Sequence, residues 1–267
     1  TVVVPAGANY HYISVTNMVT GLATNSAVPF ITTFSPLGSN TFRDKAMLTS
    51  GSSASTRGAT LADINSDGKA DLVIANSNST VSIFPNRTTS STGTVVFGPA
   101  VTIGVASGSV SSAVAVGDLN GDGKLDIATV SSGTSAVRVY NNTTSSSGAT
   151  PTFSSVTTLL GTPSTPVAVE IADLDDDGRL DIIVAGSVAS NNVVIFHNTF
   201  LLGFVALLQT FSAGTNPSAL TIGDLDKDGN PDIVVANRGS NNVTVLYNQF
   251  TLLSLLTFSS AVTLNVG

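Results

Sequence analysis

The stretch IADLDDDGRLDIIVAG, residues 171–186, decides the fold because it recurs three more times along the chain. It consists of an apolar run, a short acidic loop and a second apolar run rich in β-branched residues. The other copies are LADINSDGKADLVIAN, VGDLNGDGKLDIATV and IGDLDKDGNPDIVVAN, which begin at Leu61, Val116 and Ile222. Alternating and β-branched residues on both sides of a turn indicate strands and not a helix. The copies therefore predict a repeated β unit.

The spacing of the copies predicts the architecture. Their first acidic residues are separated by 55, 55 and 51 residues, a length that suits a four-stranded propeller blade. A third strand follows each acidic pair, as VSIFPN, VRVYNN, VVIFHN or VTVLYN, and a fourth follows a turn rich in Ser, Thr and Gly. We expect the fourth strands near residues 95–103, 153–160, 204–211 and 255–266. The fold class is thus all-β: a β-propeller of four-stranded antiparallel blades with four recognisable repeats, preceded by a short β-rich N-terminal segment.

Residues 1–36 form a different unit, because they contain no acidic loop although they also read as short strands. We therefore predict a partial β segment over residues 1–36 and propeller blades over residues 37–267.

The acidic loops share the pattern D-x-[DN]-x-D-G-x-x-D, over residues 63–71, 118–126, 173–181 and 224–232. Side-chain oxygens fall at positions 1, 3, 5 and 9, with glycine at position 6. Ca²⁺ takes six to eight oxygen ligands, and EF-hand loops use the same 1, 3, 5 spacing with glycine at 6. We therefore predict one calcium ion per loop, about four in all. The predicted side-chain ligands are Asp63, Asn65, Asp67, Asp71, Asp118, Asn120, Asp122, Asp126, Asp173, Asp175, Asp177, Asp181, Asp224, Asp226, Asp228 and Asp232, with the carbonyls of Lys69, Lys124, Arg179 and Asn230 completing the shells.

Asx-turns are the alternative, since Asp and Asn side chains also bond their own backbone without an ion. Turn chemistry does not require an acid at position 9 of every loop, which favours calcium. Of the 17 acidic residues, all but Asp44 and Glu170 lie in the loops, and four divalent ions would bring the net charge of −7 close to neutral. Asn65 and Asn120 leave their loops one charge short, so we expect weaker binding there.

Composition excludes several functions. Ten basic residues without a cluster disfavour nucleic acid and anionic membranes as partners, and no apolar run is long enough for membrane insertion. Cysteine is absent, so no disulfide or thiolate site is possible. His11 and His197 lie in no catalytic motif, and Glu170 has no second acid outside the loops. We expect no enzyme, with His197 in a structural role at a strand end.

The loops and their blade-length spacing resemble the FG-GAP or VCBS repeats of integrin α-subunit propellers and bacterial surface proteins. FGPA at residues 97–100 is a trace of the motif that names the family. The resemblance implies structural calcium loops between the first and second strands of each blade. Residues 1–36 resemble the final strands of an immunoglobulin-like IPT/TIG module, which precedes such repeats in large bacterial secreted proteins. The implied location is secreted or at the cell surface, in a bacterium.

These features favour a noncatalytic calcium-binding extracellular module for adhesion or for cell-surface or filament assembly. Its partner would be a protein or glycan at a surface, or neighbouring copies of itself. Two alternatives are a carbohydrate-binding, lectin-like propeller and the accessory propeller of a larger secreted enzyme. The number of blades in the intact protein stays open at this point, because propellers of this type usually close with more than four.

Overall fold

The structure is a computed structural model, which divides into two units, residues 1–48 and 49–267. In the first unit, β1 (Ser14–Thr16) and β2 (Ala23–Asn25) pair as an antiparallel hairpin. The rest of the predicted IPT/TIG-like segment lies outside the described residues. The structure describes residues 14–16, 23–25, 55–89, 95–105, 110–132, 134–163, 165–186, 192–200, 203–206, 211–251, 256–259 and 261–266.

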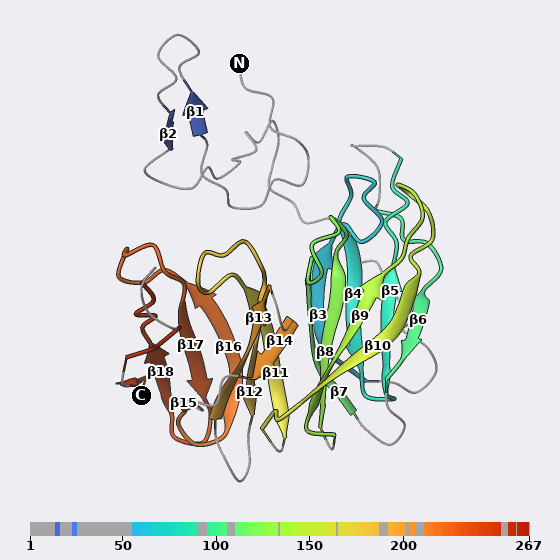
Figure 1. Cartoon of the computed structure of the whole chain (residues 1–267). Helices are drawn as coiled ribbons and strands as arrows, with labels where there is room; N and C mark the ends of the chain where they lie inside the picture. The colour runs from blue at the N-terminus through green and yellow to red at the C-terminus, as the bar shows by residue number, and fades with distance from the viewer. Residues whose placement is uncertain are drawn as a thin grey trace, which may run out of the picture. The chain divides into compact units, whose positions relative to one another are not determined.

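The second unit consists of four antiparallel sheets whose strands follow one another in chain order (Figure 1). We number these sheets as blades 1 to 4. Blade 1 is β3 (Thr56–Ala62), β4 (Asp71–Asn76), β5 (Thr80–Phe84) and β6 (Val101–Gly104); blade 2 is β7 (Val110–Gly117), β8 (Asp126–Ser132), β9 (Ala136–Asn142) and β10 (Phe153–Leu160). Blade 3 is β11 (Pro166–Ala172), β12 (Asp181–Gly186), β13 (Asn192–Thr199), β14 (Gly203–Ala206) and β15 (Phe211–Ser212); blade 4 is β16 (Pro217–Gly223), β17 (Asp232–Asn237), β18 (Asn242–Leu246) and β19 (Val262–Asn265).

The all-β propeller prediction is confirmed, and the fourth strands differ in length from the prediction. Only β10 fills its predicted range. In blade 3 the expected strand over residues 204–211 is divided into β14 and β15, which both pair with β13. In blades 1 and 4 the fourth strands are short, and the isolated bridges Asn86–Phe97 and Asn248–Phe258 extend the pairing. No helix among the described residues has the length and hydrophobicity needed to cross a bilayer.

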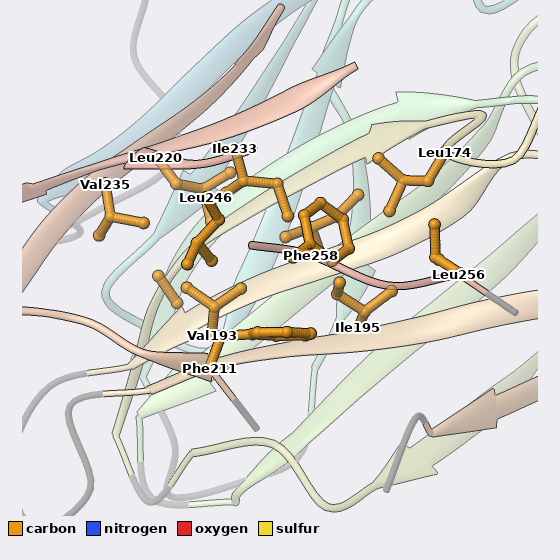
Figure 2. Packing of buried hydrophobic residues seen from close by; sticks show 12 residues of the cluster. Leu174, Val193, Ile195, Phe211, Leu220, Ile233, Val235, Leu246, Leu256 and Phe258 are labelled. Carbon is orange, nitrogen blue, oxygen red and sulfur yellow. The ribbon is translucent and has the colours of Figure 1, made fainter. Parts of the chain in front are cut away.

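The described hydrophobic residues pack into three core clusters, one between each pair of successive blades. The second strands explain this arrangement, because successive side chains of a strand point to opposite faces. In β12, Ile182 and Val184 pack toward blade 2, whereas Ile183 and Ala185 pack toward blade 4. Both faces are buried, which is why this strand reads as a continuous apolar run. Figure 2 shows the cluster between blades 3 and 4, where the rings of Phe211 and Phe258 meet edge to face with centroids 5.1 Å apart.

A buried asparagine connects each later blade to the acidic loop of the blade before it. The Nδ2 of Asn142 donates to the carbonyl of Ile64 at 2.8 Å. Asn198 donates in the same way to Leu119 at 3.0 Å, and Asn248 to Leu174 at 2.7 Å. All three carbonyls belong to position 2 of a loop. We call these three contacts the asparagine links.

The face of blade 4 that corresponds to the inter-blade faces of blades 1 to 3 is not covered by any described residue. Leu225, at position 2 of the fourth loop, is 52% exposed, whereas its counterparts Ile64, Leu119 and Leu174 are at most 4% exposed. The counterparts lie under the following blade, and no described residue covers Leu225. Blade 4 therefore has the same apolar face as the other blades, but among the described residues this face is exposed.

Each first strand contains a β-bulge near its start. The partners of Thr56 and Gly58 are the adjacent residues Asn76 and Ala75, so Arg57 is an extra, unpaired residue. The same register shift occurs at one residue of β7, β11 and β16. The extra residues there are Ser112, Val167 and Ser218.

We expect Asn142→Ala to lower the free energy of unfolding by about 1–3 kcal/mol, because it leaves the buried carbonyl of Ile64 and the partly buried carbonyl of Leu125 without this donor. Asn86 is the matched control: its Nδ2 donates to Ala70 of its own blade and to no described carbonyl of another. Chemical denaturation of both alanine variants should show the smaller loss for Asn86→Ala. Equal losses would contradict a stabilising role for the asparagine links.

Candidate metal centres

The four acidic loops have the same backbone conformation. Each connects the first and second strands of its blade and has positive φ at positions 4 and 6. At position 6 the φ angles of Gly68, Gly123, Gly178 and Gly229 lie between 81° and 94°. This left-handed region is strained for residues with a Cβ atom, which explains the glycine at that position. The repeated pattern in the sequence therefore corresponds to a repeated loop geometry.

The carboxylate at position 1 organises each loop by accepting backbone N–H groups. Asp173 accepts from Asp177 at 3.2 Å through Oδ1 and from Gly178 at 2.9 Å through Oδ2. Position 5 acts similarly, since Oδ1 of Asp177 accepts from the N–H of Arg179 at 2.8 Å. The bond from Arg179 to Asp177 is that of an Asx-turn. Together these bonds hold the carboxylates of positions 1 and 5 within one turn and use only part of their capacity as acceptors.

The carboxylate at position 9 is buried and joins the loop to the third strand. Oδ2 of Asp181 accepts from the N–H of Leu174 at 3.1 Å, and Oδ1 accepts from Asn198 at 2.7 Å. Asp71, Asp126 and Asp232 make the equivalent pair of bonds in their own blades. This explains an acid at position 9 that a turn by itself does not require.

The carboxylates converge most closely in the third and fourth loops. Within the described part of the chain, one ligand oxygen from each of Asp173, Asp175 and Asp177 lies within 4.8 Å of the others. The fourth loop gathers positions 1, 3 and 9 in the same way, through Asp224, Asp226 and Asp232. The first two loops have asparagine at position 3, so they gather fewer charges.

Position 3 supplies polar atoms that have no partner. Oδ1 of Asp175 is buried and has no hydrogen-bond partner among the described residues, and the same holds for Nδ2 of Asn65, which is almost completely buried. Buried polar atoms nearly always have a partner in folded proteins. A cation held between positions 1, 3 and 5 would satisfy the Asp175 oxygen. The donor set of carboxylate and amide oxygens fits a hard divalent ion such as Ca²⁺.

His197 lies beside the third loop, although its sequence context predicted only a structural strand end. Its Nε2 is 2.8 Å from Oδ2 of Asp175. Asp175, Asp181 and His197 form a third group whose ligand atoms lie within 4.8 Å of one another. The sequence contained a signal for this position, because His197 directly precedes Asn198, the residue that bonds to the position 9 carboxylate.

The acidic loops and the strands between them match a known family of repeats. The model of the FG-GAP-like repeat matches residues 63–129, 118–184 and 173–235, which together span more than half of the chain. The chain belongs to the FG-GAP-like repeat family. Each match begins at position 1 of one loop and extends past the loop of the next blade, so the family unit contains one inter-blade contact. Residues 1–36 lie outside the matches, and their likeness to an IPT/TIG module stays a prediction.

Solved structures resemble the FG-GAP-like chain in fold. A putative 6-phosphogluconolactonase from Bacteroides uniformis has a TM-score of 0.53 and 13% identity, over 79% of this chain and 56% of its own. BBS1N in complex with ARL6DN has a TM-score of 0.47 and 14% identity, over 78% of this chain and 56% of its own. The Dos1 propeller has a TM-score of 0.43 and 13% identity, over 73% of this chain and 46% of its own. The chain thus spans about half the length of these proteins, and identities this low concern the fold alone. No curated protein sequence matches the chain.

The position of the FG-GAP loops between first and second strands, which the family resemblance implied, is confirmed. The structure brings together three predicted ligands in each of the third and fourth loops. The carbonyls of Lys69, Lys124, Arg179 and Asn230, and the identity and number of the ions, stay predictions. The asparagine at the end of each third strand was not among the predicted site residues. This residue ties every loop to its blade.

Burial changes the protonation of several loop carboxylates. It raises the pKa of Asp71, Asp126 and Asp173 above the ordinary value, and it raises the pKa of Asp181 to about 7, against the opposing effect of two backbone N–H bonds. A raised pKa means that the folded protein holds a proton which the unfolded chain has already released. The metal-free fold is therefore favoured at low pH and loses stability as pH rises through this range.

We expect the melting temperature in chelator to be higher near pH 5 than near pH 7.5. The reason is that ionisation of Asp181 lowers the stability of the metal-free fold as pH rises from about 4 to about 7. Differential scanning calorimetry at several pH values checks this. Excess calcium should reduce or reverse the dependence, since a bound cation favours the ionised carboxylates. A metal-free melting temperature that rises from pH 5 to pH 7.5 would contradict the expectation.

Proposed function

We propose that this chain is a noncatalytic calcium-binding module of an extracellular protein, which serves in adhesion or in cell-surface or filament assembly. The observation that carries the proposal is the convergence of carboxylates in a loop geometry that recurs in every blade. When bound, calcium supplies positive charge that offsets the mutual repulsion of these carboxylates. The loops themselves are held in place by the buried acid at position 9.

The asparagine links give calcium a structural role in the proposal. Position 2 of each loop offers its carbonyl to the next blade, so ordering a loop also orders the contact between two blades. Because an ion that binds only the folded state stabilises it by mass action, calcium would tighten the whole array. A rigid array of blades suits a module that presents a surface to a partner.

The noncatalytic part of the proposal rests on the acid-base groups outside the loops. Burial alone raises the pKa of Glu170, and no charged group contributes to the shift. His197 faces Asp175 and is engaged with the third loop. General acid-base chemistry needs a pair of groups placed around a substrate, and among the described residues Glu170 has no such neighbour. A surface protein or glycan, or a neighbouring copy of the chain, is the proposed kind of partner.

We expect excess calcium to raise the melting temperature above its value in chelator. Equilibrium dialysis should show one calcium ion bound per loop. Asp177→Asn tests the third loop: it keeps the oxygen that accepts from Arg179 and removes one ligand charge, so it should cost about one bound ion and part of the calcium-dependent rise.

Asp176→Asn is the matched control, because it removes the same charge from position 4 of the same loop. Asparagine tolerates the φ of 55° found there, so the backbone should be unaffected. This variant should bind calcium like the unsubstituted chain. If calcium causes no shift and does not bind, the loops are Asx-turns and the proposed function is wrong.

A further inference from the structure

The β-bulges of the four first strands place their extra residues around one pocket. Arg57, Ser112, Val167 and Ser218, one from each blade, all line a cavity of about 470 Å³. Bulges re-aim side chains and are frequent next to binding sites. The cavity lies at the start of the four first strands, which is the end opposite the acidic loops. Its volume is in the range of small-molecule sites in proteins.

The pocket concentrates unpaired positive charge. Arg57 comes from the bulge of blade 1, and Arg238 follows the second strand of blade 4, so the two arginines enter the pocket from the first and last blades. Both are exposed, and among the described residues neither guanidinium has a carboxylate or hydrogen-bond partner. By contrast, Arg87 donates to the carbonyl of Gly148 and Arg179 stacks on Phe200. The acidic loops lie a strand length away, about 20 Å, so they do not neutralise the pocket.

The serines of the pocket are arranged as hydrogen-bond acceptors. The hydroxyl of Ser218 donates to the carbonyl of Ala236 at 3.2 Å. That of Ser112 donates to the carbonyl of Val110 at 3.4 Å and accepts from the N–H of Ser132 at 3.3 Å. Because each hydroxyl has one proton and two lone pairs, both oxygens keep at least one lone pair that can accept a further bond. A complementary ligand must therefore offer hydroxyl donors as well as an anion for the arginines. Val110, Val167 and Pro217 add an apolar wall.

We propose that this pocket binds an acidic sugar, with the sugar carboxylate held between Arg57 and Arg238 and its ring hydroxyls bonded to the serines. Guanidinium groups match carboxylates in a bidentate manner, which favours arginine for this task. Inorganic phosphate and simple carboxylates satisfy the arginines but leave the serine acceptors unused. A neutral sugar has the hydroxyls but not the charge. The ring carbons of a sugar suit the wall made by the valines and proline.

This inference deepens the proposed function, on which it rests, because it names an acidic glycan as the partner of the adhesion module. The two fail separately. Calcium-dependent stability reports on the loops, whereas ligand binding by the calcium-loaded chain reports on the pocket. A chain that is stabilised by calcium but does not bind the sugar would overturn only the inference.

The test uses the calcium-loaded chain and glucuronate as the probe, with binding measured by NMR or calorimetry at millimolar concentrations. Glucose, acetate and inorganic phosphate are the comparison ligands. We expect glucuronate to bind at least about tenfold more tightly than each of them, because each lacks either the charge or the ring hydroxyls. No binding of glucuronate, or equally tight binding of phosphate or acetate, would overturn the proposal.

Substitutions in and outside the pocket test where glucuronate binds. Arg57→Gln and Arg238→Gln should each weaken glucuronate binding about tenfold or more, as expected for the loss of a charge-assisted contact. Ser112→Trp should block the pocket from a bulge position without changing charge. The matched control is Arg87→Gln, which removes the same charge from outside the pocket and should leave the affinity unchanged. Circular dichroism and the calcium-dependent melting temperature show that each variant is folded. Equal losses in Arg57→Gln and Arg87→Gln would refute this location.

Discussion

The buried carboxylate at position 9 of each acidic loop is the contact on which the rest of the structure depends. Through one oxygen it fixes position 2 of the loop, and through the other it fixes the asparagine at the end of the third strand, as Asp181 does with Leu174 and Asn198. That asparagine then reaches the loop of the preceding blade. One charged group thus sets the loop, the blade and the spacing to the next blade. Its burial is costly, as the raised pKa of Asp181 indicates, so the loop is a place where stability depends on charge.

The sequence was sufficient to predict the local features and insufficient for the contacts between repeats. Strand alternation and glycine at position 6 are local signals, because each reflects the conformation of a few neighbouring residues. The range of β10 follows directly from them. The asparagine links, the proximity of His197 to Asp175 and the bulge at Arg57 depend instead on the register between strands and on the placement of blades. The repeated asparagine was visible in the third strands, but its role needs a partner 74 to 79 residues away.

Charge is distributed unequally between the two ends of the first strands. In a chain with only 10% charged residues, nearly all acidic groups are gathered in the loops, and two arginines are free at the other end. The stretches of the four first strands between these ends are uncharged except for Glu170 in β11, so they screen either end little. Electrostatic interactions at one end therefore act almost independently of the other beyond about 10 Å in physiological salt. The proposed calcium sites and the proposed anion site are compatible within one small domain because they lie a strand length apart.

The asparagine links also bear on how such a protein changes during evolution. A duplicated blade contains both halves of the connection, an asparagine such as Asn142 that reaches backward and a loop carbonyl such as Leu119 that receives the following blade. A duplication or deletion of one whole unit therefore leaves every remaining junction with both its asparagine donor and its carbonyl acceptor. The uncovered face at Leu225 has the same form as the faces that the inner blades cover. Selection can therefore alter the number of units without redesigning an interface.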